Sequence, residues 1–221
     1  MKSYGQFCSI ARALDLLGER WTLLVVRELL CGSRRFTDIR HGIPLVSRTM
    51  LSARLRELVD AGVIARAPDE SYDLTDAGRE LSNVVGELGT WGQRWLSREL
   101  PQHELDAEAL VWDMQRRVDT GALPARPVVA RIELADVRGR AGVRFLLLRR
   151  TEVSLCAANP GFSDELCVRA RLRTLTAWWR GDLTLADARS AGMTVQGPRE
   201  LVRSFPRWFE RYRFAEVAPA A

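Results

Sequence analysis

Arginine is concentrated in one short segment of this sequence, residues 34–56. The segment holds six arginines and one aspartate, so its net charge of +5 equals that of the whole 221-residue chain. It also carries serine and threonine, whose hydroxyls can donate hydrogen bonds to phosphates and base edges. Its pattern predicts two short helices separated at Gly42–Pro44, and a basic patch on such a helix-turn-helix is typical of a protein that binds duplex DNA.

The second of these helices has a face suited to the major groove. Ser47 is a good N-cap residue, and we expect the helix to run to about Ala61 and to end at Gly62. Its inward stripe is formed by Leu51, Leu55 and Leu58. The opposite face is small, polar and basic, and short side chains let a helix sink into the groove. We therefore predict contacts on or near base edges from Thr49, Ser52 and Arg56.

Phosphate contacts are predicted around this helix. Phosphate-binding side chains position a protein on DNA but carry little sequence information. The residues suited to this role are Arg34, Arg35, Arg48 and Arg66. Thr37 and Ser47 complete the predicted DNA-binding set.

The elements that must position this face form a helical domain with a hairpin. Helices are predicted over residues 8–18, 21–31 and 35–40, ahead of the recognition helix. Two short strands, Val63–Arg66 and Tyr72–Thr75, follow it and predict the wing of a winged helix. Arg66 would then lie where a wing residue can touch phosphate or the minor groove.

A long helix from Thr75 to about Glu99 follows, with more apolar surface than one small domain needs. Its apolar residues recur at spacings of three and four: Leu81, Val84, Val85, Leu88, Trp91 and Trp95. We predict that this stripe forms a homodimer interface, because dimers read paired half-sites on DNA. The alternative is that it packs against the C-terminal half of its own chain.

The C-terminal half predicts a second, smaller domain of mixed class. Residues 101–125 are expected to form a helical linker, with one helix over Glu104–Asp119. Over residues 126–215, period-two strands alternate with short helices, which predicts an α+β domain. The predicted strands are 128–134, 143–149, 152–157, 166–172 and 193–196, and the helices are 174–180, 185–191 and 198–212. The fold class is therefore α+β, with a mainly helical winged helix-turn-helix domain over residues 1–100.

Residues 1–100 resemble the HxlR family of bacterial winged-helix regulators. The matching motifs are Cys8, Ala13–Gly18, Arg20-Trp21-Thr22, Arg27-Glu28-Leu29, Gly32–Phe36, Ser47–Leu58, Ala61-Gly62 and Tyr72–Gly78. The resemblance implies a dimeric DNA-binding regulator, often a repressor, that dimerises through its terminal helices. In some members a cysteine at the place of Cys8 is a redox or electrophile switch, and a thiol at a helix N-terminus can have a lowered pKa. The alternative for Cys8 is a buried, inert thiol at the dimer interface.

Residues from about 126 to 213 resemble a sterol-carrier-type (SCP2-like) α+β domain. The pattern consists of an alternating strand, Leu175-Thr176, Trp179-Arg180-Gly181, a helix, Gly192–Gly197 and a last helix. Domains of this type often enclose an apolar cavity. Aromatic residues that could line a pocket for an apolar small-molecule effector are Phe162, Trp178, Trp179, Phe205 and Trp208. The alternative is that they are the core of a small domain.

The sequence lacks the motifs of a metal site, a cofactor site or a catalytic site. The four cysteines form no CxxC pair, the two histidines are far apart, and no glycine-rich phosphate loop is present, so we expect no metal, no cofactor and no enzyme activity. No segment approaches the roughly 18 apolar residues of a membrane span, and no signal peptide is evident.

The sequence thus predicts a cytoplasmic, homodimeric transcriptional regulator. It would act as a repressor that binds a palindromic operator on double-stranded DNA, modulated by a small ligand or by oxidation of Cys8. The alternative is a carrier of apolar ligands whose winged helix mediates assembly.

Overall fold

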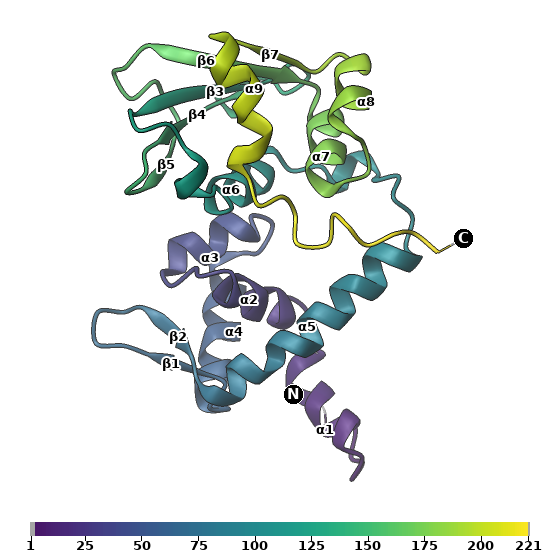
Figure 1. The fold of residues 1–221 in the computed structure, drawn as a ribbon. Coiled ribbons are helices and arrows are strands. Elements are labelled where there is room, and N and C mark those ends of the chain that lie inside the picture. The colour runs from purple at the N-terminus through teal and green to yellow at the C-terminus, as the bar shows by residue number, and fades with distance from the viewer. Residues whose placement is uncertain (1–2, 221) are drawn as a thin grey trace. The chain divides into compact units, whose positions relative to one another are not determined.

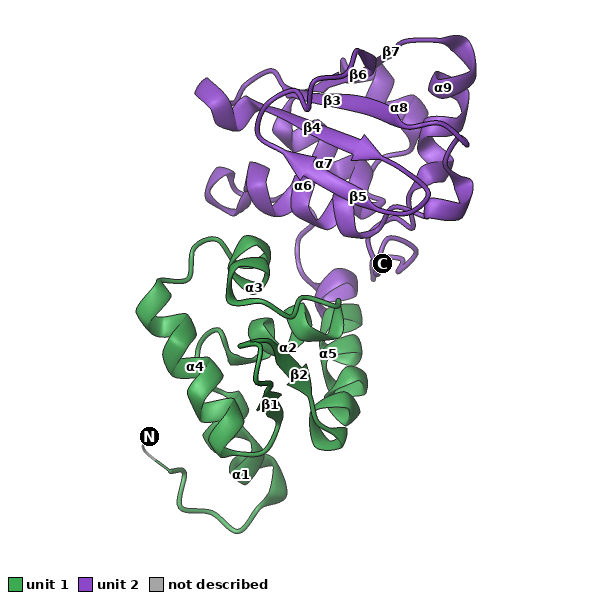
Figure 2. Ribbon diagram, turned by 90° about the vertical axis from the view of Figure 1, so that its left-hand side faces the viewer, with its two compact units in different colours: residues 1–91 green, residues 92–221 purple. Residues whose placement is uncertain are grey.

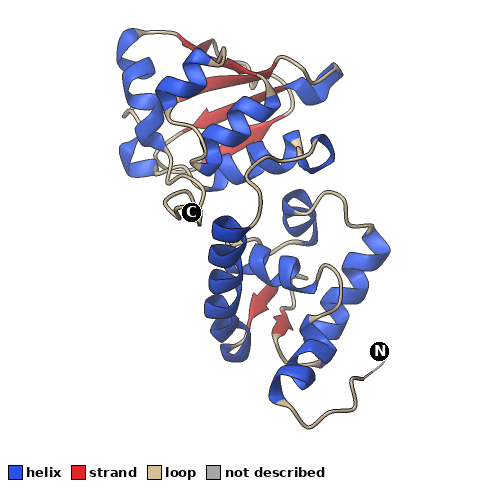
Figure 3. Ribbon diagram, turned by 90° about the vertical axis from the view of Figure 1, so that its right-hand side faces the viewer, coloured by secondary structure: helices blue, strands red, loops and turns tan. Residues whose placement is uncertain are grey.

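The chain forms two compact units, and the computed structural model describes residues 3–220 of them (Figure 1). The first unit extends to Trp91 and the second begins at Gly92, as Figure 2 shows in green and purple. The first is mainly helical with a small hairpin, and the second contains a five-stranded sheet with helices (Figure 3). This confirms the predicted α+β class, with the helical winged helix-turn-helix first in the chain.

The first unit follows the predicted order of elements. Its bounds are α1 Ser9–Leu17, α2 Thr22–Leu30, α3 Phe36–Gly42, α4 Arg48–Asp60, β1 Ile64–Arg66, β2 Tyr72–Leu74 and α5 Asp76–Trp95. The α4 helix begins where the Ser47 hydroxyl accepts a hydrogen bond from the Met50 N–H at 3.1 Å. Gly62 follows α4 at φ +70°, a backbone conformation that glycine adopts without steric cost.

The core of the first unit lies between α2, α3, α4 and the hairpin. Its buried members are Val25, Val26, Leu29, Ile39, Ile43, Val46, Leu51, Leu55, Leu58, Val63 and Ile64. The three leucines predicted to face inward from α4 are each at most 1% exposed. From α5, Leu81 and Val85 pack against this core. An apolar stripe facing the core therefore determines which face of α4 is turned to solvent.

The second unit is built on a mixed sheet. Its bounds are α6 Ala107–Arg116, β3 Val128–Leu134, β4 Val143–Leu148, β5 Val153–Cys156, β6 Asp164–Ala170, α7 Leu172–Arg180, α8 Leu185–Ser190, β7 Thr194–Gln196 and α9 Arg199–Ser204. The strand order is β5-β4-β3-β6-β7, and only the β3–β6 pair is parallel. Alternate residues of the strands pack with the helices on one face, as the period-two pattern predicts.

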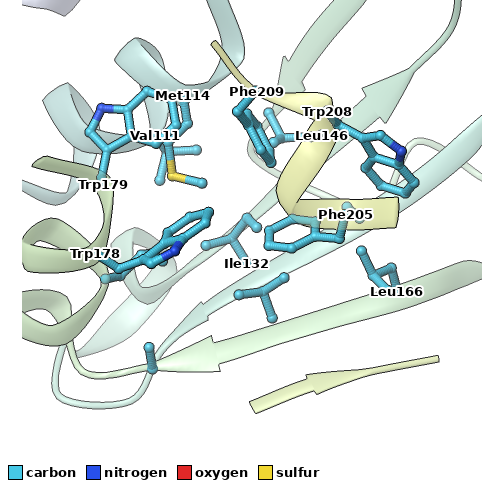
Figure 4. Close-up of a cluster of buried hydrophobic side chains, with 14 of the residues drawn as sticks. Val111, Met114, Ile132, Leu146, Leu166, Trp178, Trp179, Phe205, Trp208 and Phe209 are labelled. Carbon is cyan, nitrogen blue, oxygen red and sulfur yellow. The ribbon is translucent and has the colours of Figure 1, made fainter. Parts of the chain in front are cut away.

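Four of the five aromatic residues predicted to line an effector pocket lie in this core (Figure 4). Trp178, Trp179, Phe205 and Trp208 are at most 2% exposed. Ring centroids of Trp178 and Phe205 are 5.9 Å apart, and those of Phe205 and Trp208 are also 5.9 Å apart. Because the rings contact one another, they occupy the volume that a ligand would need. Phe162 is 51% exposed and lies outside this cluster.

The segment predicted as a helical linker is part of the second unit. The α6 helix buries Leu110, Val111 and Met114 in the main core. The Trp179 Nε1–H donates to Asp113 Oδ2 at 2.8 Å, which ties α6 to α7. The two compact units divide within α5, at residues 91 and 92, and α6 belongs to the second.

The closing helix is shorter than its predicted range of residues 198–212. The α9 helix ends at Ser204 and continues as a 3-10 turn over Phe205–Trp208. Pro206 has no N–H group, so it cannot make the helical hydrogen bond to the Val202 carbonyl.

Candidate nucleic-acid interface

The predicted DNA-contact residues are all exposed on the first unit. Thr49, Ser52 and Arg56 share one face of α4, because their spacings of three and four residues place them one above the other. Arg48 lies in the first turn of the same helix. The remaining predicted residues flank α4: Arg34, Arg35 and Thr37 around the start of α3, Ser47 at the cap of α4, and Arg66 at the end of β1. The structure thus brings the base-reading candidates together on one face.

One arginine of the basic segment does not contribute to this surface. Arg54 is 8% exposed, and its Nη1 lies 2.8 Å from Glu57 Oε2 and 3.2 Å from Glu19 Oε2. It joins α4 to the segment before α2. The positive charge available to a polyanion is therefore smaller than the arginine count of the segment indicates.

A buried carboxylate holds α3 in place beside α2. Glu28 is 0% exposed, and the Arg27 Nη2–H groups donate to Glu28 Oε1 at 2.7 Å and to the Gly42 carbonyl at 3.0 Å. The Ser33 N–H also donates to the Glu28 carbonyl at 3.0 Å. The sequence analysis gave Glu28 only as part of the motif Arg27-Glu28-Leu29 and assigned it no role, although an adjacent pair of charges in a mainly apolar helix was a usable signal. This arrangement sets the geometry of the helix-turn-helix.

The hairpin is fastened to the start of α3 by ion pairs. Arg35 Nη2 lies 2.9 Å from Asp69 Oδ2, and Arg34 pairs with Asp73, whereas a third pair, Arg66 with Glu70, lies within the hairpin itself. The Tyr72 N–H also donates to the Arg34 carbonyl at 2.8 Å. These acids were not among the predicted site residues. A pairing between residues as far apart as 34 and 73 leaves no local pattern, whereas the spacing of Arg66 and Glu70 is local.

The carboxylate of Asp69 also closes the turn of the hairpin. Its Oδ1 accepts hydrogen bonds from the Ser71 hydroxyl at 2.7 Å and the Ser71 N–H at 3.2 Å. These two bonds, with the Arg35 charge, hold the pKa of Asp69 below its usual value. The carboxylate is therefore ionised at neutral pH and remains so when the solution is made mildly acidic.

Cys8 is the N-cap residue of α1, and its side chain is exposed. The backbone N–H groups of Ala11 and Ile10 lower the pKa of the thiol from its usual value. In contrast, burial raises the pKa of Cys167.

Apolar side chains are exposed along α1 and α5. On and before α1 the exposed residues are Tyr4, Phe7, Ile10 and Leu14, and on α5 and just after it they are Val84, Leu88, Trp91, Trp95 and Leu96. Phe7 is 98% exposed and Trp91 is 55% exposed. On α5 these side chains recur at helical spacing, which makes this face a candidate interaction surface.

Residues 3–220 show neither a metal site nor a membrane-spanning helix. Within residues 3–220, histidine, cysteine, aspartate and glutamate do not gather in groups of three that could hold a metal ion. None of the helices in that part of the chain has the length and apolar character needed to span a membrane.

Comparisons with known proteins match the first unit. The HxlR-like helix-turn-helix family matches residues 16–100. An uncharacterized HTH-type transcriptional regulator of Mycobacterium bovis is 46% identical over 98 residues, which cover 41% of this chain and 60% of the relative. The uncharacterized HTH-type transcriptional regulator YvaP of Bacillus subtilis is 40% identical over 91 residues, covering 38% of this chain and 84% of YvaP.

Solved structures match the same part of the chain. The quinone-bound regulator YodB of Bacillus subtilis is 36% identical, with a TM-score of 0.36, and the match covers 39% of this chain and 97% of YodB. The chain thus spans most of YvaP and YodB but only 60% of the mycobacterial relative. Its N-terminal part carries the family motifs in register, and through this part the chain belongs to the HxlR-like helix-turn-helix family.

Proposed function

We propose that this chain is a sequence-specific transcriptional repressor that binds a palindromic operator as a homodimer. The observation that carries the proposal is the exposed face of α4, where Thr49, Ser52 and Arg56 lie together opposite the buried leucines. Arg56 and Arg48 have no acidic partner within residues 3–220, so both are available to DNA. Relatives that share the family are named HTH-type transcriptional regulators, which supports a role in regulation.

In the homodimer, the α4 helix of the second chain contacts the second half-site of the operator. The apolar stripe of α5 would be covered by the same stripe of a second chain, as in an isologous twofold interface. Two recognition helices held at fixed separation then reach paired half-sites in successive major grooves. A signal that changes this separation would change operator affinity, because both half-sites must be engaged together.

The proposal is tested on the DNA upstream of the gene for this chain, against a scrambled duplex, at physiological salt. We expect affinity for the native duplex to be about a thousandfold tighter or more. Arg56→Ala should weaken that selective binding by about 1–3 kcal/mol, because a bidentate base contact is lost. Arg79→Ala, an exposed arginine on α5, is the matched control and should change selectivity little. Equal affinity of wild type and Arg56→Ala for the native duplex would contradict the assignment.

We further propose that Cys8 senses oxidants or electrophiles. Its exposure and lowered pKa increase the thiolate fraction at neutral pH, and the thiolate is the reactive form. We expect treatment with a quinone to change the DNA affinity of the wild-type chain and to leave Cys8→Ser unaffected. Reactivity should fall as the pH is lowered through the depressed pKa. Cys167→Ser is the control and should respond like wild type; a full response in Cys8→Ser would refute the role.

For the second unit we propose a sterol-carrier-type domain that extends the dimer or takes an apolar effector. A sheet with helices packed on one face supports the domain type. The effector has less support, since four of the predicted pocket aromatics already fill the core. A ligand that binds there must raise the melting temperature of the chain.

We also propose that the protein acts in the cytoplasm, and that it regulates rather than catalyses.

A further inference from the structure

Three of the predicted phosphate-binding arginines already have acidic partners on the wing. Arg34 pairs with Asp73, Arg35 with Asp69, and Arg66 with Glu70. The wing acids, defined here as Asp69, Glu70 and Asp73, therefore cancel the charge of these three arginines. Within residues 34–56 of the described structure, the arginines without an acidic partner are Arg40, Arg48 and Arg56, and the last two lie on α4.

The pairs are exposed, so DNA could reach them. The side chains of Arg34, Arg35 and Arg66 are 59%, 54% and 52% exposed, and those of their partners are 43% exposed or more. Exposed ion pairs contribute little to folding stability, about 0–1 kcal/mol each. Folding stability alone therefore gives little reason for three such pairs at one edge of a DNA-binding surface.

The geometry of the hairpin turn fixes the position of its acidic side chains. Arg35 donates both to the carboxylate of Asp69 and to its backbone carbonyl, while the same carboxylate is held by Ser71. Glu70 has a left-handed backbone with φ +65°, which is uncommon for a residue with a side chain. The guanidinium of Arg35 is thus held in a defined position by the hydrogen-bonded turn.

We propose that the wing acids determine specificity by keeping Arg34, Arg35 and Arg66 from attracting phosphates of any sequence. The proposal rests on the DNA-binding function proposed above. Contacts to phosphates supply nearly all of non-specific affinity, so each arginine held by an acid lowers binding to wrong sequences. Attraction is then weighted toward α4, where Arg48 and Arg56 lie beside the side chains that face the bases.

The test compares three full-length variants on a scrambled duplex and on the native upstream duplex, across a salt titration. Glu70→Gln and Asp73→Asn each free one arginine, and neither side-chain carboxylate has another hydrogen bond or ion pair in the described structure. Glu80→Gln is the matched control, since it removes one exposed negative charge on α5 without freeing an arginine. Circular dichroism and melting temperature establish that all variants are folded.

We expect tighter binding of the scrambled duplex and reduced selectivity in the two wing variants. Each freed arginine on a bound protomer should steepen the slope of log affinity against log salt by about 0.9, a change of roughly 3- to 4-fold between 50 and 200 mM salt. Slopes and affinities equal to those of Glu80→Gln would overturn the inference. Weaker binding in the wing variants would also overturn it, because the acids would then serve to position the arginines for DNA.

Failure of the proposed function gives a different result. A wild-type chain whose binding to both duplexes is weak and unselective would refute the repressor assignment and this inference with it. A wild-type chain that selects the native duplex, with wing variants that match the control, would refute only the role of the wing acids.

Discussion

A chain carrying Leu88→Arg is expected to be monomeric and to lose tight binding to an operator of two half-sites. Leu88 is 53% exposed in the middle of the apolar stripe that also holds Val84 and Trp91. In a twofold interface the substitution places a charge from each protomer within apolar surface, where neither has a partner. Losing the second half-site contact should reduce operator affinity about 100-fold or more.

The measurement is the molar mass in solution, with operator affinity as the second readout. Asn83→Arg is the control, because it adds the same charge to an exposed position of α5 outside the stripe. It should remain dimeric and bind normally. If Leu88→Arg is still a dimer with wild-type affinity, the interface lies elsewhere; if the wild-type chain is itself monomeric, the dimer is refuted directly.

A chain carrying Gly42→Ala is expected to lose about 3–5 kcal/mol of folding stability, the cost of disrupting a buried charge pair. A Cβ at this position would lie 1.9 Å from Glu28 Oε2 and 2.0 Å from Glu28 Cδ. The carboxylate would have to move although Glu28 is 0% exposed and bonded to Arg27, whose guanidinium also holds the Gly42 carbonyl. The melting temperature of the first unit should fall by more than about 10 °C.

The matched control is Gly92→Ala in α5. A Cβ there would meet its nearest neighbour, Leu96 Cδ1, at 3.8 Å, which is an ordinary contact. Alanine is the better helix former by about 1 kcal/mol, so this variant should be neutral or slightly stabilised. An unchanged melting temperature in Gly42→Ala would mean that the Glu28 carboxylate can rotate away freely, and that it does not hold α3 against α2.

Much of the fold was predictable because its signals are local. The hydroxyl of Ser47, the apolar spacing of Leu51 and Leu55, and the glycine at position 62 each act within a few residues, and together they place α4 and its outward face. The alternation along Val128–Leu134 similarly predicts β3. The base-reading face follows directly, since it is the side of α4 opposite its buried stripe.

What depended on contacts between distant residues could not be predicted. The acids that pair with Arg34 and Arg35 come from the folded hairpin, and nothing near Arg34 in the sequence indicates that Asp73 will reach it. The burial of α6, and of the tryptophans and Phe205 expected to line a pocket, likewise required knowing which surfaces meet. Local sequence therefore determined the helices, strands and exposed faces of this protein. The tertiary structure decided which charges remain free and which apolar faces are covered, because both depend on proximity in space.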